Sequence, residues 1–316
     1  MKQNNTPIPL IVTAGSTYLD IDAYACAVAL AELLRLTGED ALAYSEASTN
    51  YSVCPSLTKE SQILRTLPTD FRESEARYII VDVSDPDYIK GPVPLDRVTS
   101  VYDHHVGFEA YWQERIGDGA HIEFIGAAAT LIYREWIAQG LQNSMSPSTA
   151  RLLVAAILDN TLNLTSANTT EEDREAFTEL CRIGGVDTDW CGTYFSEVQT
   201  LVESDLKNAL MGDLKILRDT DVLPPRMAQL CVWDAHRILE RLPEIRTWFD
   251  GPSAWMINII DLKERVSYFV CNDETHMRKL ESVFGVTFTS GVARSKVSYL
   301  RKEIIKKACF SQAAHP

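Results

Sequence analysis

The N-terminal half of the chain alternates short apolar runs with longer segments whose apolar residues recur at helical spacing. The apolar run at residues 8–12 precedes Gly15, and residues 23–36 then follow a helical pattern that ends near Gly38. Short, continuously apolar runs are typical of strands that are buried on both faces of a parallel sheet. The first forty residues therefore predict a strand, a turn and a helix.

The same unit recurs along the rest of this half. Two further apolar runs, at residues 78–83 and 98–102, predict strands, and the helical pattern returns at 127–139, 148–158 and 171–183. Sequential alternation of strands and helices is typical of a parallel sheet with crossover helices. We therefore predict an α/β fold whose parallel sheet carries helices on both faces.

The pattern changes after Gly184-Gly185. Residues 186–195 have no clear periodicity and predict a loop, so we place the domain boundary there, with residues 1–188 in the first domain and 189–316 in the second. The second domain is predicted to be a smaller α/β domain. Its expected strands are at 228–232, 254–261 and 266–271, and its expected helices are at 235–242, at 276–284 and near the C-terminus.

Composition narrows the classes of partner. The net charge is −14, which argues against nucleic acid, because binding to phosphate backbones needs clustered Lys and Arg. The seven Cys are scattered, with no CxxC pair, as expected of reduced thiols. The chain has no apolar run of about 18 residues and its start lacks a signal-peptide pattern, so we expect a cytoplasmic protein without a membrane partner.

Acidic and imidazole side chains follow three of the predicted strands. Asp20 and Asp22 come after the first strand, Asp82 closes the second, and an Asp-His-His segment at 103–105 follows the third. In open parallel sheets, ligands bind outside the carboxyl ends of the strands. Clustered carboxylates repel one another unless a cation neutralises them, and carboxylates with imidazoles suit Mn, Co or Zn better than Ca. The sequence therefore predicts a divalent metal site.

Four ordered motifs carry a family resemblance. They are LDIDAYACAVAL, IIVDVSD, VYDHHVG and, after the segment IEFIGAAATLIYREW, AAILDNTLNLTSANTTEED; weaker matches are ESDLK, MAQLCVWDA and SYLRKEIIKKA. The chain resembles the DHH phosphoesterases with a DHHA2 C-terminal domain, which include the family II inorganic pyrophosphatases and the prune-like exopolyphosphatases. The resemblance implies an active site in the cleft between a DHH domain and a smaller DHHA2 domain.

The resemblance also implies roles for individual residues. His105 is expected to face the substrate phosphate, and Asp103 to orient a neighbouring imidazole. The cofactor is expected to be Mn²⁺, with Co²⁺ or Mg²⁺ as alternatives. Asp82 would bridge two ions, and the implied metal ligands are Asp20 on the first ion, Asp22 and His104 on the second, Asp82, and either Asp159 or Asn160 at the end of the fourth motif.

Basic residues near the C-terminus are implied to bind the substrate phosphates. Lys207 and the pair Arg301 and Lys302 match the family in one alignment, whereas Arg294 and Lys296 replace that pair in another. Basic side chains suit the role because they donate hydrogen bonds to phosphate oxygens and offset developing charge. A solvated helix face is the alternative interpretation for each of them.

Two positions depart from the family pattern. Ser16 stands where the family has a metal-binding His, and Asn160 stands where it has an Asp. Asp159 is adjacent, but neighbouring helical residues point about 100° apart, so it does not simply replace the missing carboxylate. Less negative charge lowers the affinity for divalent ions, and a single-metal site, a different metal or lost activity are the alternatives.

Two functions of different classes follow. The first is metal-dependent hydrolysis of phosphoanhydride bonds in pyrophosphate or short-chain polyphosphate, with residues 185–195 as the hinge between the domains. The second is a catalytically degenerate protein that binds a phosphorylated ligand or a protein partner. Cleavage of a small phosphodiester ranks lower, because the Gly-rich basic C-terminal motif of those relatives is absent. The oligomeric state, including a homodimer, is left open.

Overall fold

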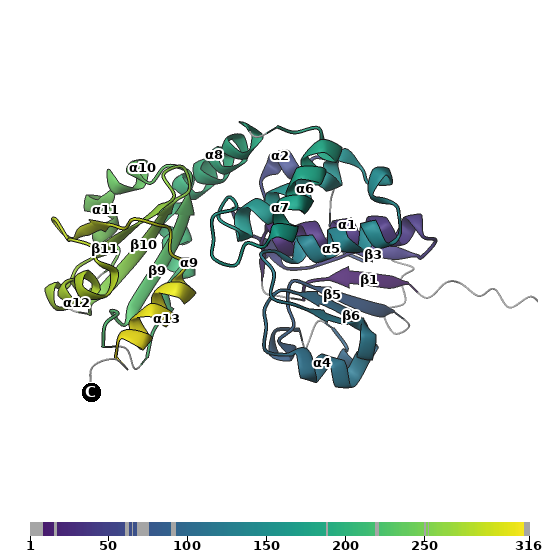
Figure 1. Ribbon diagram of the computed structural model, residues 1–316, viewed down its shortest axis with the longest axis horizontal. Helices are drawn as coiled ribbons and strands as arrows, with labels where there is room; N and C mark the ends of the chain where they lie inside the picture. The colour runs from purple at the N-terminus through teal and green to yellow at the C-terminus, as the bar shows by residue number, and fades with distance from the viewer. Residues whose placement is uncertain are drawn as a thin grey trace, which may run out of the picture. The chain divides into compact units, whose positions relative to one another are not determined.

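The chain forms two compact units. The computed structural model describes residues 9–15, 18–60, 63–64, 66–67, 76–89, 93–187, 189–218, 221–249, 251 and 253–312. The first unit is Met1–Cys191 and the second is Gly192–Pro316. Within the described residues, each unit is built on one five-stranded sheet (Figure 1).

The sheet of the first unit is entirely parallel in the part of the chain that the structure describes. Its strand order is β3-β1-β5-β6-β7, and every neighbouring pair runs in the same direction. The strands predicted at 78–83 and 98–102 are confirmed, and that at 8–12 is confirmed from residue 10 onward. The bounds are β1 (Leu10–Thr13), β3 (Ala41–Ala43), β5 (Arg77–Val81), β6 (Val98–Asp103) and β7 (Ala120–Ile122), with a small pair β2 (Tyr18–Leu19) and β4 (Ser48–Thr49).

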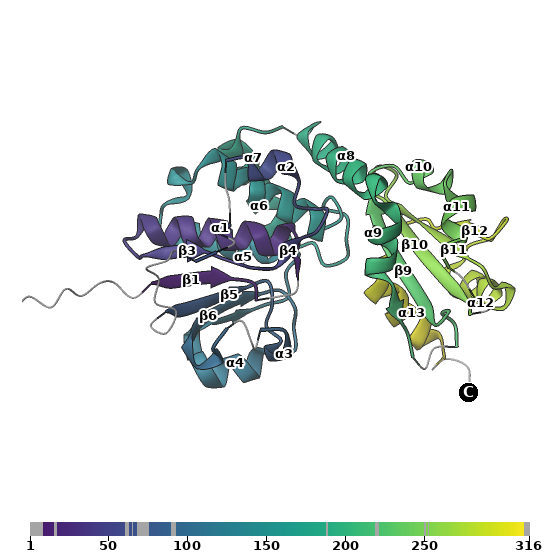
Figure 2. The same ribbon diagram turned by 180° about the vertical axis from the view of Figure 1, so that it is seen from behind.

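Helices cover both faces of this sheet, as predicted (Figures 1 and 2). Four helices lie on one face: α1 (Ile21–Leu36), α5 (Ala128–Ala138), α6 (Pro147–Asn160) and α7 (Glu171–Gly184). The other face carries α3 (Pro86–Ile89) and α4 (Glu109–Ile116), whose Ile89 and Trp112 are buried among strand residues. The remaining short elements are α2 (Pro55–Thr58) and 3-10 turns at Leu95–Arg97, Gly117–Gly119 and Gln142–Ser144.

Sequence signals explain where α6 begins and where α7 begins and ends. The Ser146 side chain caps α6 by accepting from the Thr149 amide, and a Pro occupies the first turn. Thr170 and Asp173 form a capping box at the start of α7. Gly185 ends that helix with a left-handed φ of 64°.

The second unit has a mixed sheet of order β12-β11-β10-β9-β8, in which β9 and β10 are parallel and the other described pairs are antiparallel. The three predicted strands are confirmed. Residues of α12 and α13 pack with the strands in one core cluster. The bounds are β8 (Lys215–Ile216), β9 (Arg226–Val232), β10 (Trp255–Asp261), β11 (Val266–Cys271), β12 (Val292–Arg294), α9 (Leu206–Asp213), α10 (His236–Leu239), α11 (Leu242–Arg246), α12 (Glu274–Phe284) and α13 (Arg301–Gln312).

The predicted loop at 186–195 is wrong over most of its length. Residues Asp189–Ser204 form the helix α8, which crosses the boundary between the two units. Its buried residues recur at helical spacing: Cys191, Tyr194, Phe195, Val198 and Val202. Gly192 masked this pattern, because glycine inside a helix lowers its propensity. Residues 189–195 are therefore helical rather than a loop, and the hinge between the domains stays a prediction.

The predicted helix at 235–242 is also corrected, because it forms two short helices. It divides into α10 and α11, and a Pro occupies the first turn of α11. Proline lacks the amide hydrogen that would continue a helix from the residues before it. The helix predicted at 276–284 is confirmed as α12.

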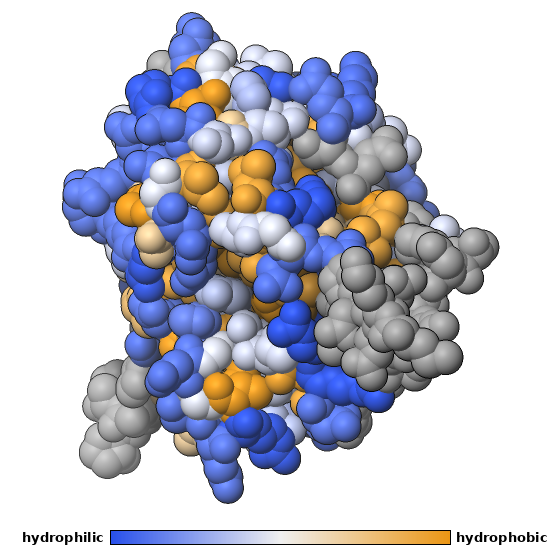
Figure 3. Space-filling model, turned by 90° about the vertical axis from the view of Figure 1, so that its right-hand side faces the viewer, coloured by the Kyte–Doolittle hydropathy of each residue, from blue (hydrophilic) through white to orange (hydrophobic). Residues whose placement is uncertain are grey.

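Among the residues that the structure describes, no helix has both the length and the apolar character needed to cross a bilayer. Figure 3 shows hydrophobic side chains on one face of the molecule as separate groups between hydrophilic ones.

Candidate metal centre

The carboxyl ends of β1, β5 and β6 bring the predicted ligands to one edge of the sheet. These strands are adjacent and parallel, so the residues that follow them meet. Asp20 caps α1, and its Oδ1 accepts from the Ala23 amide at 3.0 Å. Asp82 follows β5 directly, and the Asp-His-His segment lies at the end of β6. The predicted convergence of acids and imidazoles is found.

Asp82 lies at the centre of this group. Its backbone adopts a left-handed φ of 57°, and its amide donates to the Tyr102 carbonyl at 2.7 Å. The Asp82 side chain is only 5% exposed, and its Oδ1 lies 3.4 Å from His104 Nε2 and 4.0 Å from His105 Nδ1. Ligand atoms of these three residues lie within 4.8 Å of one another. We call Asp82, His104 and His105 the N-terminal cluster.

Several carboxylates lie around Asp82, and their charges affect its pKa. Burial raises the pKa of Asp82 well above its ordinary value, and the charges of Asp22, Asp20 and Asp103 and a hydrogen bond with Asp20 raise it further. Burial and the charge of Asp20 raise the pKa of Asp22 to about 7. Among the described residues, no Lys or Arg forms an ion pair with any of these carboxylates. Carboxylates crowded in this way need a cation or protons.

Two buried oxygen atoms show that the cluster fits a metal ion. Asp82 Oδ1 and Asp103 Oδ2 are buried and accept no hydrogen bond. Buried polar atoms are nearly always satisfied in native structures, so buried acceptors without a donor beside an imidazole are suited to bind a cation. Carboxylate and imidazole ligands together suit Mn²⁺ and similar first-row ions.

His104 is oriented for coordination by its second nitrogen. Its Nδ1 lies 3.2 Å from the Ile125 carbonyl oxygen, which can only accept a hydrogen bond. Nδ1 therefore carries the proton in the neutral ring, and the lone pair of Nε2 faces Asp82. This arrangement is typical of metal-binding histidines, which usually donate their other N–H to a carbonyl or carboxylate.

Asp22 is fixed by the beginning of α5. Its side chain is fully buried, Oδ2 accepts from the Ala128 amide at 2.8 Å, and Oδ1 accepts from the Ala129 amide at 2.8 Å and from Cys26 Sγ at 3.3 Å. The first turn of a helix presents unpaired amides and the positive end of its dipole, which stabilises an anion. Sequence analysis missed these main-chain donors, although the GAAAT segment at 126–130 marks their position.

His105 points outward and is held by Asp103. Its side chain is 64% exposed, and Asp103 Oδ1 accepts from both Nδ1 at 2.8 Å and the His105 amide at 3.1 Å. The hydrogen bond with Asp103 raises the pKa of His105, and the negative charges of Asp103, Asp22 and Asp20 act in the same direction. An imidazole held in this way presents its Nε2 to solvent and favours the cationic form, which suits contact with a phosphate oxygen.

The fourth motif contains an unusual turn directly after the end of α6. Asp159 and Asn160 are the last residues of α6, and both are partly buried. The three residues after Thr161 have left-handed φ angles: Leu162 at 50°, Asn163 at 57° and Leu164 at 61°. Consecutive residues of this kind are strained, and such strain gathers at functional sites. The N-terminal cluster does not include Asp159, so the role of Asp159 or Asn160 as a ligand stays a prediction, and Ser16 lies outside the described residues.

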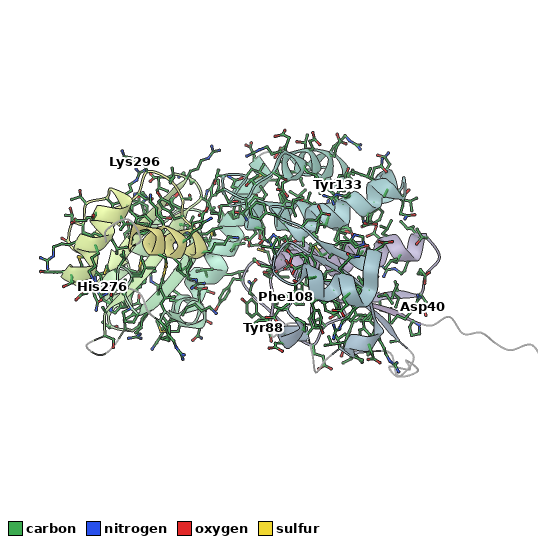
Figure 4. All side chains as sticks on the ribbon, turned by 60° about the horizontal axis from the view of Figure 1, so that its bottom comes forward. Asp40, Tyr88, Phe108, Tyr133, His276 and Lys296 are labelled. Atoms are coloured by element: carbon green, nitrogen blue, oxygen red, sulfur yellow. The ribbon has the colours of Figure 1, made fainter. Side chains whose placement is uncertain are left out.

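The predicted phosphate-binding residues of the second unit differ in their partners. Arg301 opens α13, and its guanidinium binds both carboxylate oxygens of Asp213, at 2.7 Å each. Arg294 lies 3.3 Å from Glu264 Oε2, whereas Lys207, Lys296 and Lys302 are exposed, with Lys296 at the surface (Figure 4). A phosphate would have to compete with Asp213 for Arg301, so the exposed lysines are the more accessible cations.

A second group of candidate ligands, which sequence analysis did not single out, lies in the second unit. Asp234, His236 and Asp261 place ligand atoms within 4.8 Å of one another, and we call them the C-terminal cluster. Asp261 is buried, and it accepts from the Ala235 amide at 2.8 Å and the Glu264 amide at 2.6 Å. These carboxylates are already satisfied by the main chain.

Comparisons with known proteins support the predicted resemblance and the fold. No protein-family model matches the chain. A protein of Bacillus licheniformis named "probable manganese-dependent inorganic pyrophosphatase" is 25% identical and covers 93% of this chain and 96% of its own length. A protein of the same name from Deinococcus radiodurans is 22% identical and covers 90% of this chain and 92% of its own length.

The fold and the cluster at the strand ends define an α/β protein with a candidate carboxylate–imidazole metal site. A solved structure from Methanococcus jannaschii, described as a "putative family II inorganic pyrophosphatase", superposes with a TM-score of 0.62 at 16% identity and covers 95% of this chain and 97% of that chain. The resemblance that the motifs predicted is supported by the names of the relatives, and the solved structure shares the fold.

Proposed function

We propose that this protein hydrolyses phosphoanhydride bonds in pyrophosphate or short-chain polyphosphate with a divalent metal ion, of which Mn²⁺ fits best. The proposal depends above all on the unsatisfied, buried oxygen of Asp82 beside His104. The names of these two relatives support the same chemistry and the same ion, and the matched region spans more than nine-tenths of each relative's length.

The residues of the first unit have distinct roles in this proposal. Asp82 and His104 would hold the metal, with Asp20, Asp22 and either Asp159 or Asn160 as further ligands. When bound, the metal supplies an activated water at neutral pH and polarises the phosphoryl oxygens. The uncompensated carboxylates attract the cation and fix its position.

His105 and the basic residues would bind the substrate. His105, held by Asp103, donates from Nε2 to a phosphoryl oxygen and offsets the charge that develops there. We propose Lys207, Arg301 and Lys302 as further phosphate ligands, with Arg294 and Lys296 as the alternative pair. Lys296 and Lys302 are both exposed, but the Arg294 side chain is 53% exposed, whereas that of Arg301 is 18% exposed and binds both oxygens of Asp213. This difference between the two arginines favours the alternative pair.

A non-catalytic protein is the second candidate. Asn160 carries no charge where the resembled family has an Asp, and Ser16 stands where it has a His. Fewer charged ligands weaken a metal site. In that case the same residues would bind a phosphorylated ligand, or a protein partner, without turnover.

One experiment separates the two candidates. The full chain is stripped with chelator, reloaded with Mn²⁺, Co²⁺ or Mg²⁺, and assayed for phosphate release from pyrophosphate and tripolyphosphate between pH 7 and 9. Metal-dependent release supports the hydrolase. No release with any ion, together with a rise in melting temperature on adding pyrophosphate, supports the binding protein.

A further inference from the structure

The segment 125–129, which follows β7 and includes the first two residues of α5, contacts two of the proposed metal ligands through its main chain. The Ile125 carbonyl oxygen faces His104 Nδ1, and the Ala128 and Ala129 amides donate to Asp22. Main-chain contacts depend on the path of the backbone and not on the side chains of the segment. Whatever fixes this backbone therefore fixes both ligands.

Asp173, on α7, fixes that backbone. Asp173 Oδ2 accepts from the Gly126 amide at 3.0 Å, and Oδ1 accepts from Thr130 Oγ1 at 2.6 Å. These two bonds hold the segment on both sides of Ala128. Helices α5 and α7 lie side by side (Figure 1), and Asp173 is fully buried.

The contact between Gly126 and Asp173 leaves no room for a side chain at residue 126. A Cβ atom at Gly126 would lie 2.4 Å from Asp173 Oδ2 and 2.7 Å from Thr161 Cγ2. The first approach is far shorter than real Cβ contacts, so glycine is required where the backbone meets the carboxylate. Thr161, which directly follows α6 in the fourth motif, packs against Gly126 as well.

Asp173 also takes part in the capping box of its own helix, α7, in addition to its contacts with Gly126 and Thr130. Its Oδ2 accepts from the Thr170 amide at 2.7 Å and from Thr170 Oγ1 at 2.8 Å, and its own amide donates back to Thr170 Oγ1 at 3.2 Å. The two threonines therefore bind Asp173 in different contexts. Thr170 belongs to the cap of α7, and Thr130 lies on α5, directly after the segment 125–129.

We propose that Asp173 is a positioning residue of the metal site: through Gly126 and Thr130 it sets the backbone that fixes the tautomer of His104 and the carboxylate of Asp22. The inference rests on the proposed function, because it concerns the same metal site. It assigns a role to a residue outside the ligand set, on a helix that contributes none of the proposed ligands.

The test is a matched pair of substitutions, Thr130→Val and Thr170→Val, each of which removes one hydroxyl from Asp173 and keeps the shape of the side chain. The affinity of the full chain for Mn²⁺ is measured from the electron paramagnetic resonance signal of the free ion. We expect Thr130→Val to weaken binding about tenfold, the low end for residues that orient metal ligands. Thr170→Val is expected to lower the melting temperature without changing the affinity.

Two further variants test Asp173 itself. Asp173→Ala is expected to weaken Mn²⁺ binding by about 10- to 100-fold. Asp173→Asn is expected to restore most of it, because its amide oxygen can accept from Gly126 and Thr170 while its NH₂ group donates to Thr130. If Asp173→Ala does not fold, the threonine pair decides.

The outcomes separate this inference from the proposed function. Equal effects of the two threonine variants on Mn²⁺ affinity, or no effect of either, overturn the inference alone. A wild-type chain that binds Mn²⁺ without hydrolysing pyrophosphate, but loses affinity only in Thr130→Val, supports the inference and rejects the hydrolase. A wild-type chain that binds no Mn²⁺ overturns both.

Discussion

The N-terminal cluster contains one Asp and two His, and the C-terminal cluster contains two Asp and one His, with the ligand atoms of each cluster within 4.8 Å of one another. The two clusters differ in how their carboxylates are satisfied. In the N-terminal cluster, Asp82 Oδ1 is buried and accepts no hydrogen bond. In the C-terminal cluster, both oxygens of Asp261 accept from main-chain amides, and Asp234 lies 3.8 Å from Lys263 Nζ.

The difference shows that proximity of metal-ligating atoms does not by itself indicate a metal site. The carboxylates of the C-terminal cluster have hydrogen-bond donors and a lysine nearby, so they need no further cation. Asp82, the one carboxylate of the N-terminal cluster, is buried near the like charges of Asp20, Asp22 and Asp103, and protons or a metal ion must neutralise it. From the cost of leaving Asp82 unneutralised we infer that the N-terminal cluster is the candidate metal site.

The difference between the clusters is tested most directly by removing one carboxylate from each. We expect Asp82→Asn to weaken Mn²⁺ binding more than about 100-fold, beyond the range for residues that only orient ligands. Asp234→Asn is the matched control and should leave the affinity unchanged. Isothermal titration with Mn²⁺ measures both; similar losses in the two variants would contradict the distinction between the clusters.

The histidines of the two clusters provide the next comparison. We expect His105→Ala to lower kcat/KM for pyrophosphate by about 100-fold, as expected when a donor to a developing oxyanion is lost. His236→Ala should leave kcat/KM unchanged, because its ring contacts Asp234 in the cluster that needs no cation. Steady-state phosphate release measures both variants, and an inactive His236→Ala would reverse the assignment.

Metal removal should expose the charge repulsion as a pH effect. In the unfolded chain the Asp22 and Asp82 carboxyls ionise near pH 4, whereas the folded pKa of Asp22 is about 7 and that of Asp82 is well above its ordinary value. The metal-free folded chain thus binds more protons than the unfolded chain, and the stability from these groups is lost as the pH rises from about 4 through 7.

The measurement is the melting temperature between pH 5 and 8, with chelator and with saturating Mn²⁺. We expect Mn²⁺ to raise the melting temperature most at pH 8, because the cation then replaces the protons. Asp82→Asn in chelator should show a weaker fall with pH than the wild type. A gap between the two curves that is constant with pH would argue against buried like charges as its cause.

The smallest expected effects concern the basic residues of the second unit. Arg301→Ala removes the paired hydrogen bonds to Asp213 and should lower the free energy of unfolding by about 1–3 kcal/mol. Lys296→Ala, at an exposed position, should leave stability unchanged and raise KM a few-fold, about the effect of one surface charge contact. Chemical unfolding and steady-state kinetics check the pair; a KM effect confined to Arg301→Ala would favour the other alignment.

Much of the fold could be predicted because its signals are local. The buried strands β5 and β6 and the helix α7 follow from short apolar runs, helical periodicity and the caps at Thr170 and Gly185. The short edge strands β3 and β7 were missed because three residues carry too little pattern. The helix α8 was missed because Gly192 interrupts its propensity while its apolar face still packs.

The sequence by itself determined the order of the elements and the acids and imidazoles at the strand ends, because both depend on residues that are neighbours along the chain. Only the tertiary structure decided how those groups are held. Asp22 meets the Ala128 amide 106 residues away, and Gly126 meets Asp173 across 47 residues. Which oxygen is satisfied and which is left for a cation depends on such distant contacts, and no local pattern records them.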